Sequence, residues 1–290
     1  MVLQPNDGPR DAFTEMAGRR LVEVRGTDAR SWLHDLLTAD VEELEPGRSS
    51  VALLLSPTGR IRAVVGVAGL AEGFLLIQAP DQPAPIDALL APYVLSSNVG
   101  LADRSDDLRL FAVAGEPGRL PGAAVLRPSA LTWVLDLLVD ADRAKEVRVA
   151  LEAEGLREVD ATRVEAWRIG RGLARFPADL TPDSLPHEAS FGEAIDLDKG
   201  CYLGQEAVAK VRNLGHPPWV LRAMEAPEPV EPGTVLRAGT EDAGAVTSSA
   251  PAGEGEGAVL ARIRWVHRDR ALQLPDGTAI GPGREAAGMA

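Results

Sequence analysis

The sequence predicts an α+β fold that ends in a small β-barrel. Predicted strands occur in runs with only occasional helices between them, which argues against a doubly wound parallel sheet. After a segment rich in proline and acidic residues at 226–233, short strands alternate with glycine-rich turns, as they do in small barrels. The length of 290 residues, 45% of them apolar, is sufficient for about two domains with buried cores.

Short apolar runs between turn residues predict the strands of the first half. These runs lie at residues 21–24, 51–55, 60–67, 74–78, 99–102 and 108–113. Asp28 is predicted to cap a helix that places apolar residues such as Trp32 and Leu36 on one face. A second helix is predicted near residues 86–93. The polar residues 1–11 are expected to form a loose arm.

The second half is predicted to repeat this mixture of strands and helices. A buried strand is expected at residues 131–139, and a helix is expected to run from Asp142 to Glu154. Another helix is predicted to begin near Asp160. The barrel strands are expected at residues 235–237, 244–248 and 258–265. The last residues, 281–290, are expected to be a frayed tail.

The composition excludes several classes of protein. The chain has 30 basic and 43 acidic side chains, and the net charge of −13 argues against sequence-independent binding of nucleic acid. The single cysteine, Cys201, allows neither an internal disulfide nor a zinc ribbon nor a protein-ligated iron–sulfur cluster. With four scattered histidines besides, we expect no metal site made by this chain alone.

No segment has the character of a membrane span or a signal peptide. The longest apolar stretch, at residues 63–71, is far shorter than the roughly 20 residues that a spanning helix needs. The N-terminal residues lack the charged head and apolar body of a secretory signal. We therefore expect a cytoplasmic protein that does not contact a membrane.

The residues that carry chemistry concentrate at 198–210. This segment contains Cys201 and two of the three lysines in the chain, Lys199 and Lys210. Its glycines allow the backbone to bend sharply and to approach a ligand closely. The composition after them favours a helix, and a helix N-terminus and a nearby ammonium group both favour a thiolate. On these observations Cys201 is either a reactive thiol or a buried structural cysteine.

Other candidate groups carry weaker signals. Arg168, Arg171 and Arg175 fit an anionic ligand and a solvated charged face equally well. His34 is expected on the exposed side of its helix, and His267 is expected at the surface. The sequence has no phosphate-binding loop, dinucleotide-binding glycine motif or nucleophile elbow.

Residues 199–206, Lys-Gly-Cys-Tyr-Leu-Gly-Gln-Glu, resemble the K-G-C-Y-x-G-Q-E signature of the YgfZ family. Members of this family are folate-binding proteins related to the T-protein aminomethyltransferase of the glycine cleavage system. The similarity extends over most of the chain. It includes the segments 26–33, 37–41, 55–61, 167–172, 244–248 and 258–261.

The resemblance implies an aminomethyltransferase-like fold. Two α+β lobes and a C-terminal β-barrel would form a ring, with weakly held tetrahydrofolate in the central opening. The implied domains are residues 12–107 for the N-terminal folate-binding lobe, 108–215 for the second lobe with the signature, and 216–284 for the barrel.

The resemblance also implies the residues of the site. Cys201 would be the reactive thiol, assisted by Lys199, and no metal ligands are implied. The residues implied to contact folate are Trp167, Arg168, Arg175, Gly200, Tyr202, Gly204, Gln205 and Glu206.

The implied role is assistance in the assembly or repair of iron–sulfur clusters in client enzymes, including those that thiolate tRNA. The implied partners are iron–sulfur client enzymes or the assembly machinery, without direct contact with nucleic acid. We expect a monomer, because a ring-shaped fold closes on itself.

Two departures from the aminomethyltransferases bear on activity. Their catalytic aspartate after the glycine hairpin is missing, because Gly59 is followed by Arg60 and Arg62 without a carboxylate. Gly170 stands where their L-R-x-E-A-G motif has a folate-binding glutamate. The alternative function, a tetrahydrofolate-dependent aminomethyltransferase or another C1-transfer enzyme, therefore lacks its charged participant. A sensor or interaction module that kept only the fold is a third possibility.

Overall fold

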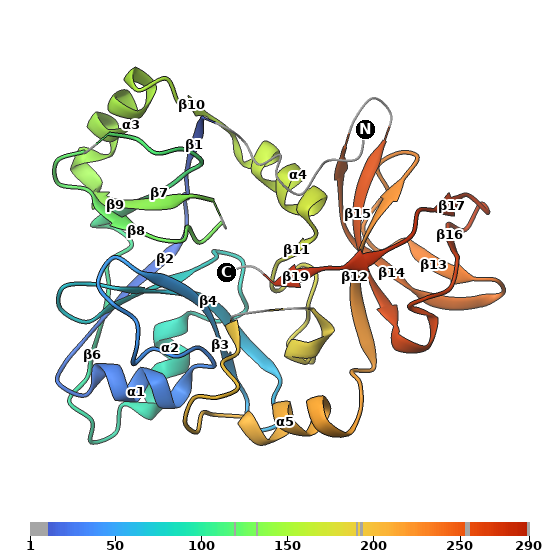
Figure 1. Cartoon of the computed structure of the whole chain (residues 1–290), viewed down its shortest axis with the longest axis horizontal. Helices are drawn as coiled ribbons and strands as arrows, with labels where there is room; N and C mark the ends of the chain where they lie inside the picture. The colour runs from blue at the N-terminus through green and yellow to red at the C-terminus, as the bar shows by residue number, and fades with distance from the viewer. Residues whose placement is uncertain are drawn as a thin grey trace.

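Three large β-sheets form the framework of the computed structural model, which describes residues 11–118, 120–131, 133–189, 191, 194–252 and 256–288 (Figure 1). Residues 1–10 of the expected arm lie outside the described residues. Two five-stranded sheets lie on one side of the molecule and a seven-stranded sheet lies on the other, with helix α4 (Ala161–Arg171) between them. The architecture is mixed α/β, with strands in runs, as the sequence predicts.

The first sheet contains five of the six strands predicted for the first half of the chain; the sixth, at residues 108–113, lies in the second sheet. The antiparallel order of the first sheet is β3 (Ser49–Leu55), β4 (Ile61–Gly69), β5 (Phe74–Gln78), β2 (Arg20–Arg25) and β6 (Gly100–Asp103). Helix α1 (Ala29–Leu36) and helix α2 (Ile86–Leu90), which η1 (Ala91–Tyr93) continues, belong to the same unit. Trp32 and Leu33 of α1 pack on Leu54 and Val65 of the sheet, and this contact buries the predicted apolar face of the helix.

The second sheet contains a strand near the N-terminus, at residues 12–15, that the sequence did not predict. Its order is β10 (Arg157–Glu158), β1 (Ala12–Glu15), β7 (Leu108–Val113), β9 (Leu135–Asp140) and β8 (Ala124–Leu126). Because β1 pairs with β7 and β10, the first strand of the chain joins a sheet made mostly by residues far along the sequence. The helix expected from Asp142 to Glu154 is present as η2 (Ala141–Arg143) followed by α3 (Ala144–Ala153).

The third sheet curls into a half-barrel in the region where the sequence predicts a small barrel. Its order is β17 (Ala279–Ile280), β16 (Leu272–Gln273), β13 (Val235–Ala238), β14 (Glu241–Pro251), β15 (Gly257–Arg264), β12 (Trp219–Ala226) and β18 (Arg284–Glu285). Strand β12 was not predicted, since apolar residues face both of its sides. Val220 and Met224 belong to the barrel core, whereas Leu221 and Ala223 pack into a cluster shared with α4 and the first sheet.

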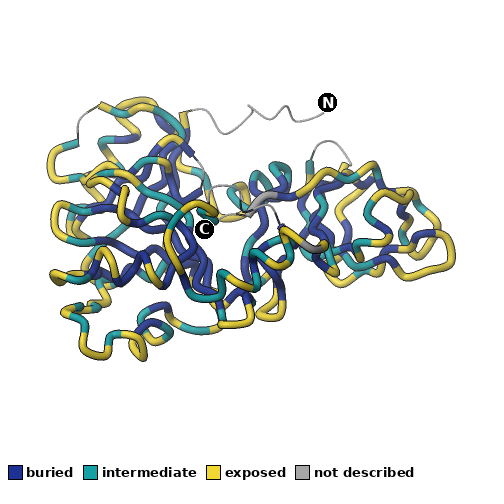
Figure 2. The backbone as a smooth tube through the Cα atoms, turned by 60° about the horizontal axis from the view of Figure 1, so that its bottom comes forward, coloured by how far each residue is buried: buried dark blue, intermediate teal, exposed yellow. Residues whose placement is uncertain are grey.

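The prediction of a frayed C-terminal tail is wrong. Strand β18 pairs with β12, and β19 (Ala287–Gly288) runs parallel to β11 (Leu173–Ala174), just after α4. Ala286 between them is 1% exposed. Backbone hydrogen bonds to distant strands hold this short segment, although its local sequence has no strand pattern. Figure 2 shows buried backbone running from the two five-stranded sheets through the region of α4 into the barrel. None of the helices in the described residues is long and apolar enough to cross a membrane.

Candidate functional site

The signature residues form a loop that packs between the β3–β4 hairpin and α5 (Gln205–Leu214). Gly204 precedes α5 with a φ of +85°, and a Cβ atom there would lie 2.6 Å from the carbonyl oxygen of Ser56. A Cβ atom on Gly59, at the tip of the hairpin, would lie 2.7 Å from the Cβ of Ala207. Only glycine fits at both positions, so the hairpin and the start of α5 interlock through backbone contact.

Cys201 is exposed in this loop, residues 196–204, which we call the Cys201 loop. The neighbouring Tyr202 is 6% exposed and belongs to the core cluster shared by the first sheet, α4 and the barrel. The core therefore anchors the loop by Tyr202 and leaves the thiol at the surface. The expected accessibility of Cys201 is confirmed, and a buried, space-filling cysteine is excluded.

Lys199 is held by the end of α1. Its Nζ donates to the carbonyl oxygens of His34, Leu37 and Ala39 at 2.5, 2.8 and 2.9 Å. His34 and Leu37 lie at the C-terminal end of α1, where a cation is favourable, and Ala39 follows the helix. Burial lowers the pKa of Lys199 to about 8, so the ammonium group remains charged at neutral pH. Its three N–H groups bind carbonyls, and its observed role is to attach the loop to α1 rather than to assist Cys201.

His34 is buried beside the Cys201 loop, and its predicted place on the exposed side of the helix is wrong. The residue is 7% exposed, and its Nδ1 lies 3.2 Å from Oδ1 of Asp40. Its Nε2 lies 3.7 Å from the position that a Cβ atom on Gly200 would occupy. The loop covers this side of α1, because the N–H groups of Asp196 and Leu203 donate to α1 and the residues after it. The imidazole lies next to Gly200 only because of this tertiary packing. The sequence around His34 gives no sign of it.

Arg168 belongs to a buried network of protein groups, which corrects its expected role as a folate contact. It is 1% exposed and donates to Glu165 at 2.6 Å and to Asp179 at 2.7 Å. It also donates to Oγ of Ser248 on β14, so it ties α4 to the barrel. Arg175 joins the same network, with its Nη1 3.2 Å from Glu165. A buried charge needs such partners, and they occupy the guanidinium group of Arg168; Arg175 is only half-buried, and its Nε has no hydrogen-bond partner among the described residues.

Trp167 and Trp133 line a cavity of about 270 Å³ between α4 and the end of β14. Their ring centroids lie 5.7 Å apart in an edge-to-face arrangement, and the indole N–H groups of both are buried without a hydrogen-bond partner among the described residues. We call this space the tryptophan cavity. Gly170 also lines it, and its full lining is Trp133, Val159, Arg163, Val164, Ala166, Trp167, Gly170, Arg171, Pro251 and Ala252.

The structure separates two groups of residues that the sequence had combined into one folate site. Trp167 lines the tryptophan cavity, but none of the signature residues Gly200, Tyr202, Gly204, Gln205 and Glu206 does. These five belong instead to the Cys201 loop and the first turn of α5. Sequence analysis also missed Trp133, whose position in an apolar run gives no sign of a cavity.

The tryptophan cavity fits a flat heteroaromatic ring in part. Its indole rings offer a stacking surface for such a ring, but their N–H groups are buried and are not accessible from the cavity. No carboxylate lines the cavity, so the donor groups of a pterin would remain unpaired. Its volume is slightly below the roughly 300–1,000 Å³ that is usual for drug-sized ligands. The residues present therefore favour a shallow ring site over an enclosed folate site.

The fold defines the class to which the chain belongs. It superimposes with a TM-score of 0.80 on the glycine cleavage system aminomethyltransferase T from Bartonella henselae, at 18% sequence identity, over 95% of this chain and 85% of that one. The chain is therefore a protein with the aminomethyltransferase fold. No family model matches the sequence.

Sequence relatives specify the family within this class. The chain is 29% identical over 235 residues to the human mitochondrial iron-sulfur cluster assembly factor IBA57, and 28% identical over 235 residues to the tRNA-modifying protein YgfZ of Klebsiella pneumoniae. Each match covers 73% of this chain, and the matches span 65% and 71% of the respective relatives. The chain is thus similar in sequence to YgfZ and to the IBA57 assembly factors, and similar in fold to an aminomethyltransferase.

Proposed function

We propose that the protein assists the assembly or repair of iron–sulfur clusters in client enzymes, including tRNA-modifying ones, as an accessory factor rather than an enzyme. The observation that carries the proposal is the exposed thiol of Cys201 on a loop that backbone contacts and a core tyrosine hold in place. A relative with the name of an iron-sulfur cluster assembly factor supports it.

The thiol of Cys201 is the group that meets the cluster or a sulfur species, which are the cargo of the reaction. A cysteine that handles such cargo must be reachable by a partner protein and held in one place, and the Cys201 loop meets both conditions. Carboxylates lie near this loop, as shown by the influence of Asp40, Asp196 and Asp35 on Lys199. The docking face of a client or assembly protein is therefore expected to be basic.

Folate is the proposed ligand of the tryptophan cavity. Trp133 and Trp167 would hold the pterin ring by stacking. Gly170 contributes no carboxylate, so the donors of the ring lack the partner that the aminomethyltransferases supply. Each unpaired buried donor costs about 1–3 kcal/mol, and the proposed binding of tetrahydrofolate is accordingly weak.

Replacement of Cys201 by serine tests the proposed function. Cys201→Ser keeps nearly the same volume at an exposed position, so the variant should melt at the wild-type temperature. We expect it to fail to restore the activity of iron–sulfur enzymes in a deletion strain. Asn213→Ser, at an exposed position of α5, is the matched control and should restore that activity fully. Full rescue by Cys201→Ser would exclude a thiol mechanism.

A further inference from the structure

Strand β12 carries an arginine on the side that builds the barrel core. Side chains alternate along a strand, and Val220 and Met224 of β12 lie in that core whereas Leu221 and Ala223 face α4. Arg222 lies on the same side of the strand as Val220 and Met224 and is half-buried. A guanidinium group next to apolar side chains is unfavourable unless its donors find partners.

The donors of Arg222 are only partly used. Its Nη2 donates to the carbonyl oxygen of Gly283, which is a neutral acceptor. Its Nε is buried and has no hydrogen-bond partner among the described residues. Nε is thus out of reach of a ligand, but Nη1 has no partner among the described residues and is not buried, so its N–H groups are available for an acceptor that enters the space in front of them.

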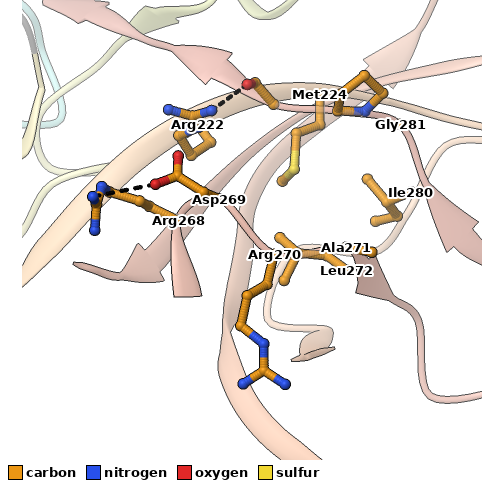
Figure 3. Close-up of a pocket in the computed structure, with 11 residues that line it drawn as sticks. Arg222, Met224, Arg268, Asp269, Arg270, Ala271, Leu272, Ile280 and Gly281 are labelled. Atoms are coloured by element: carbon orange, nitrogen blue, oxygen red, sulfur yellow. Dashed lines mark hydrogen bonds and ion pairs between the residues drawn. The ribbon is translucent and has the colours of Figure 1, made fainter. Parts of the chain in front are cut away.

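That space is a cavity of about 420 Å³, drawn in Figure 3. Met224, Leu272 and Ile280 give it an apolar side, and Arg222 and the Arg268–Asp269 pair lie opposite. The volume lies within the roughly 300–1,000 Å³ of small-molecule sites. The cavity thus combines an apolar wall with a charged end, which is the usual composition of a site for a small amphipathic ligand.

The other cations of the cavity already have carboxylate partners. Nη2 of Arg268 lies 3.2 Å from Oδ2 of Asp269, and Nη1 of Arg270 lies 2.7 Å from Oε2 of Glu241. Arg270 also points away from Arg222 in Figure 3. Arg222 is therefore the cation best placed to receive a ligand, and a single guanidinium group matches a single negative charge. Asp269 nearby disfavours a dianion such as phosphate by repulsion.

We propose that this cavity binds a small monocarboxylate with an apolar body. The carboxylate pairs with Arg222, because a guanidinium N–H forms a strong charge-assisted hydrogen bond with that group. The hydrocarbon body packs on Met224, Leu272 and Ile280. The site contains none of the residues of the Cys201 loop or the tryptophan cavity, and it stands independently of the proposed function.

Titration of the full-length protein with octanoate tests this site. The chain has four methionines, so ¹³C-methyl labelling of methionine gives a spectrum in which the Met224 signal can be assigned. We expect a saturable shift of the Met224 methyl signal. Arg222→Leu removes the charge-assisted hydrogen bond, and we expect this variant to bind octanoate about tenfold more weakly, or weaker still. Arg264→Leu, at an exposed arginine of β15 outside the cavity lining, is the matched control and should bind like the wild type.

Comparison of ligands gives an answer even if Arg222→Leu does not fold. On the wild-type protein, 1-octanol has the same hydrocarbon body without the charge and should bind about tenfold more weakly than octanoate. Equal binding of the two ligands, or the absence of a saturable shift of Met224, would overturn the proposal. Tighter binding of inorganic phosphate than of octanoate, measured by competition, would overturn the assignment of a monocarboxylate.

Discussion

The Cys201 loop and the tryptophan cavity are built in opposite ways. The loop is positioned by backbone contact at Gly204 and Gly59 and presents the thiol of Cys201 to solvent. The cavity is made by side chains, which are mostly apolar or aromatic and include two arginines but no carboxylate. The loop therefore has the rigidity that chemistry at one atom requires, whereas the cavity has a surface for stacking but lacks the groups for tight and directional binding.

The largest effect is expected at Asp136, which supports the tryptophan cavity. Asp136 is 1% exposed and its Oδ2 accepts a hydrogen bond from the N–H of Ala130, which closes the turn that carries Trp133. Burial raises its pKa to about 7, against the opposing effects of Ala130, Ser129 and Arg19. Between pH of about 4 and about 7, Asp136 is therefore protonated in the folded state and ionised in the unfolded chain. The free energy of unfolding falls as the pH rises through this range.

The variant Asp136→Asn should remove this pH dependence. The loss for the wild type reaches about 4 kcal/mol by the relation of 1.36 kcal/mol per pKa unit. Asparagine keeps the acceptor for Ala130 and carries no charge. Urea unfolding of both proteins at pH 5 and pH 8 measures the difference, because all other titrating groups are shared. An equal change in the free energy of unfolding between pH 5 and pH 8 in the two proteins would contradict the prediction.

A smaller loss of stability is expected in the Cys201 loop. Gly204→Ala adds a methyl group 2.6 Å from the carbonyl oxygen of Ser56, at a positive φ, and should lower the free energy of unfolding by roughly 2–3 kcal/mol. Gly233→Ala is the matched control: its φ of +94° is similar, but no atom lies within 4 Å of the added group. Its expected loss is about 1 kcal/mol, from backbone strain alone. Equal losses in the two variants would mean that the hairpin contact is not rigid.

The missing carboxylate of the tryptophan cavity provides a gain-of-function test. Gly170→Glu places a carboxylate in the cavity lining and should tighten the binding of tetrahydrofolate by about tenfold, measured by calorimetry. Gly170→Ala controls for the change in helix propensity and should leave the affinity at its wild-type value. Sub-micromolar binding by the wild type, or no response to Gly170→Glu, would show that folate binds elsewhere.

No effect is expected in an assay for aminomethyl transfer. The hairpin after Gly59 carries Arg60 and Arg62, which repel a cationic aminomethyl group, and Arg60 lies against the carbonyl oxygen of Asp183. The protein should therefore release no ammonia from an aminomethylated lipoyl carrier protein in the presence of tetrahydrofolate. Folate-dependent release above the rate of a heat-inactivated sample would favour the C1-transfer alternative.

Several features follow from the sequence because the information is local. The strands of the first sheet, α1 with its apolar face, and the barrel strands around β14 and β15 are visible as periodicity and turn residues. The helix after Cys201 follows from composition, and the signature motif identifies the loop. The family could also be recognised from these short segments.

Other features were decided by contacts between residues far apart in the chain. Strand β1 lies in the second sheet because β7 and β10 supply its hydrogen bonds, and β18 and β19 form because β12 and β11 supply theirs. A segment of two to four residues has no periodicity from which such pairing can be predicted.

The same limit applies to the candidate site. His34 is buried because a loop about 165 residues away in sequence covers its helix. Arg168 is unavailable to a ligand because Asp179 and Ser248 meet it from other elements. By itself the sequence determined which chemical groups the protein has and which local elements carry them. Only the tertiary structure decided which groups are exposed, which are paired, and that Cys201 and Trp167 lie in separate parts of the molecule, because burial and partner choice depend on packing between distant segments.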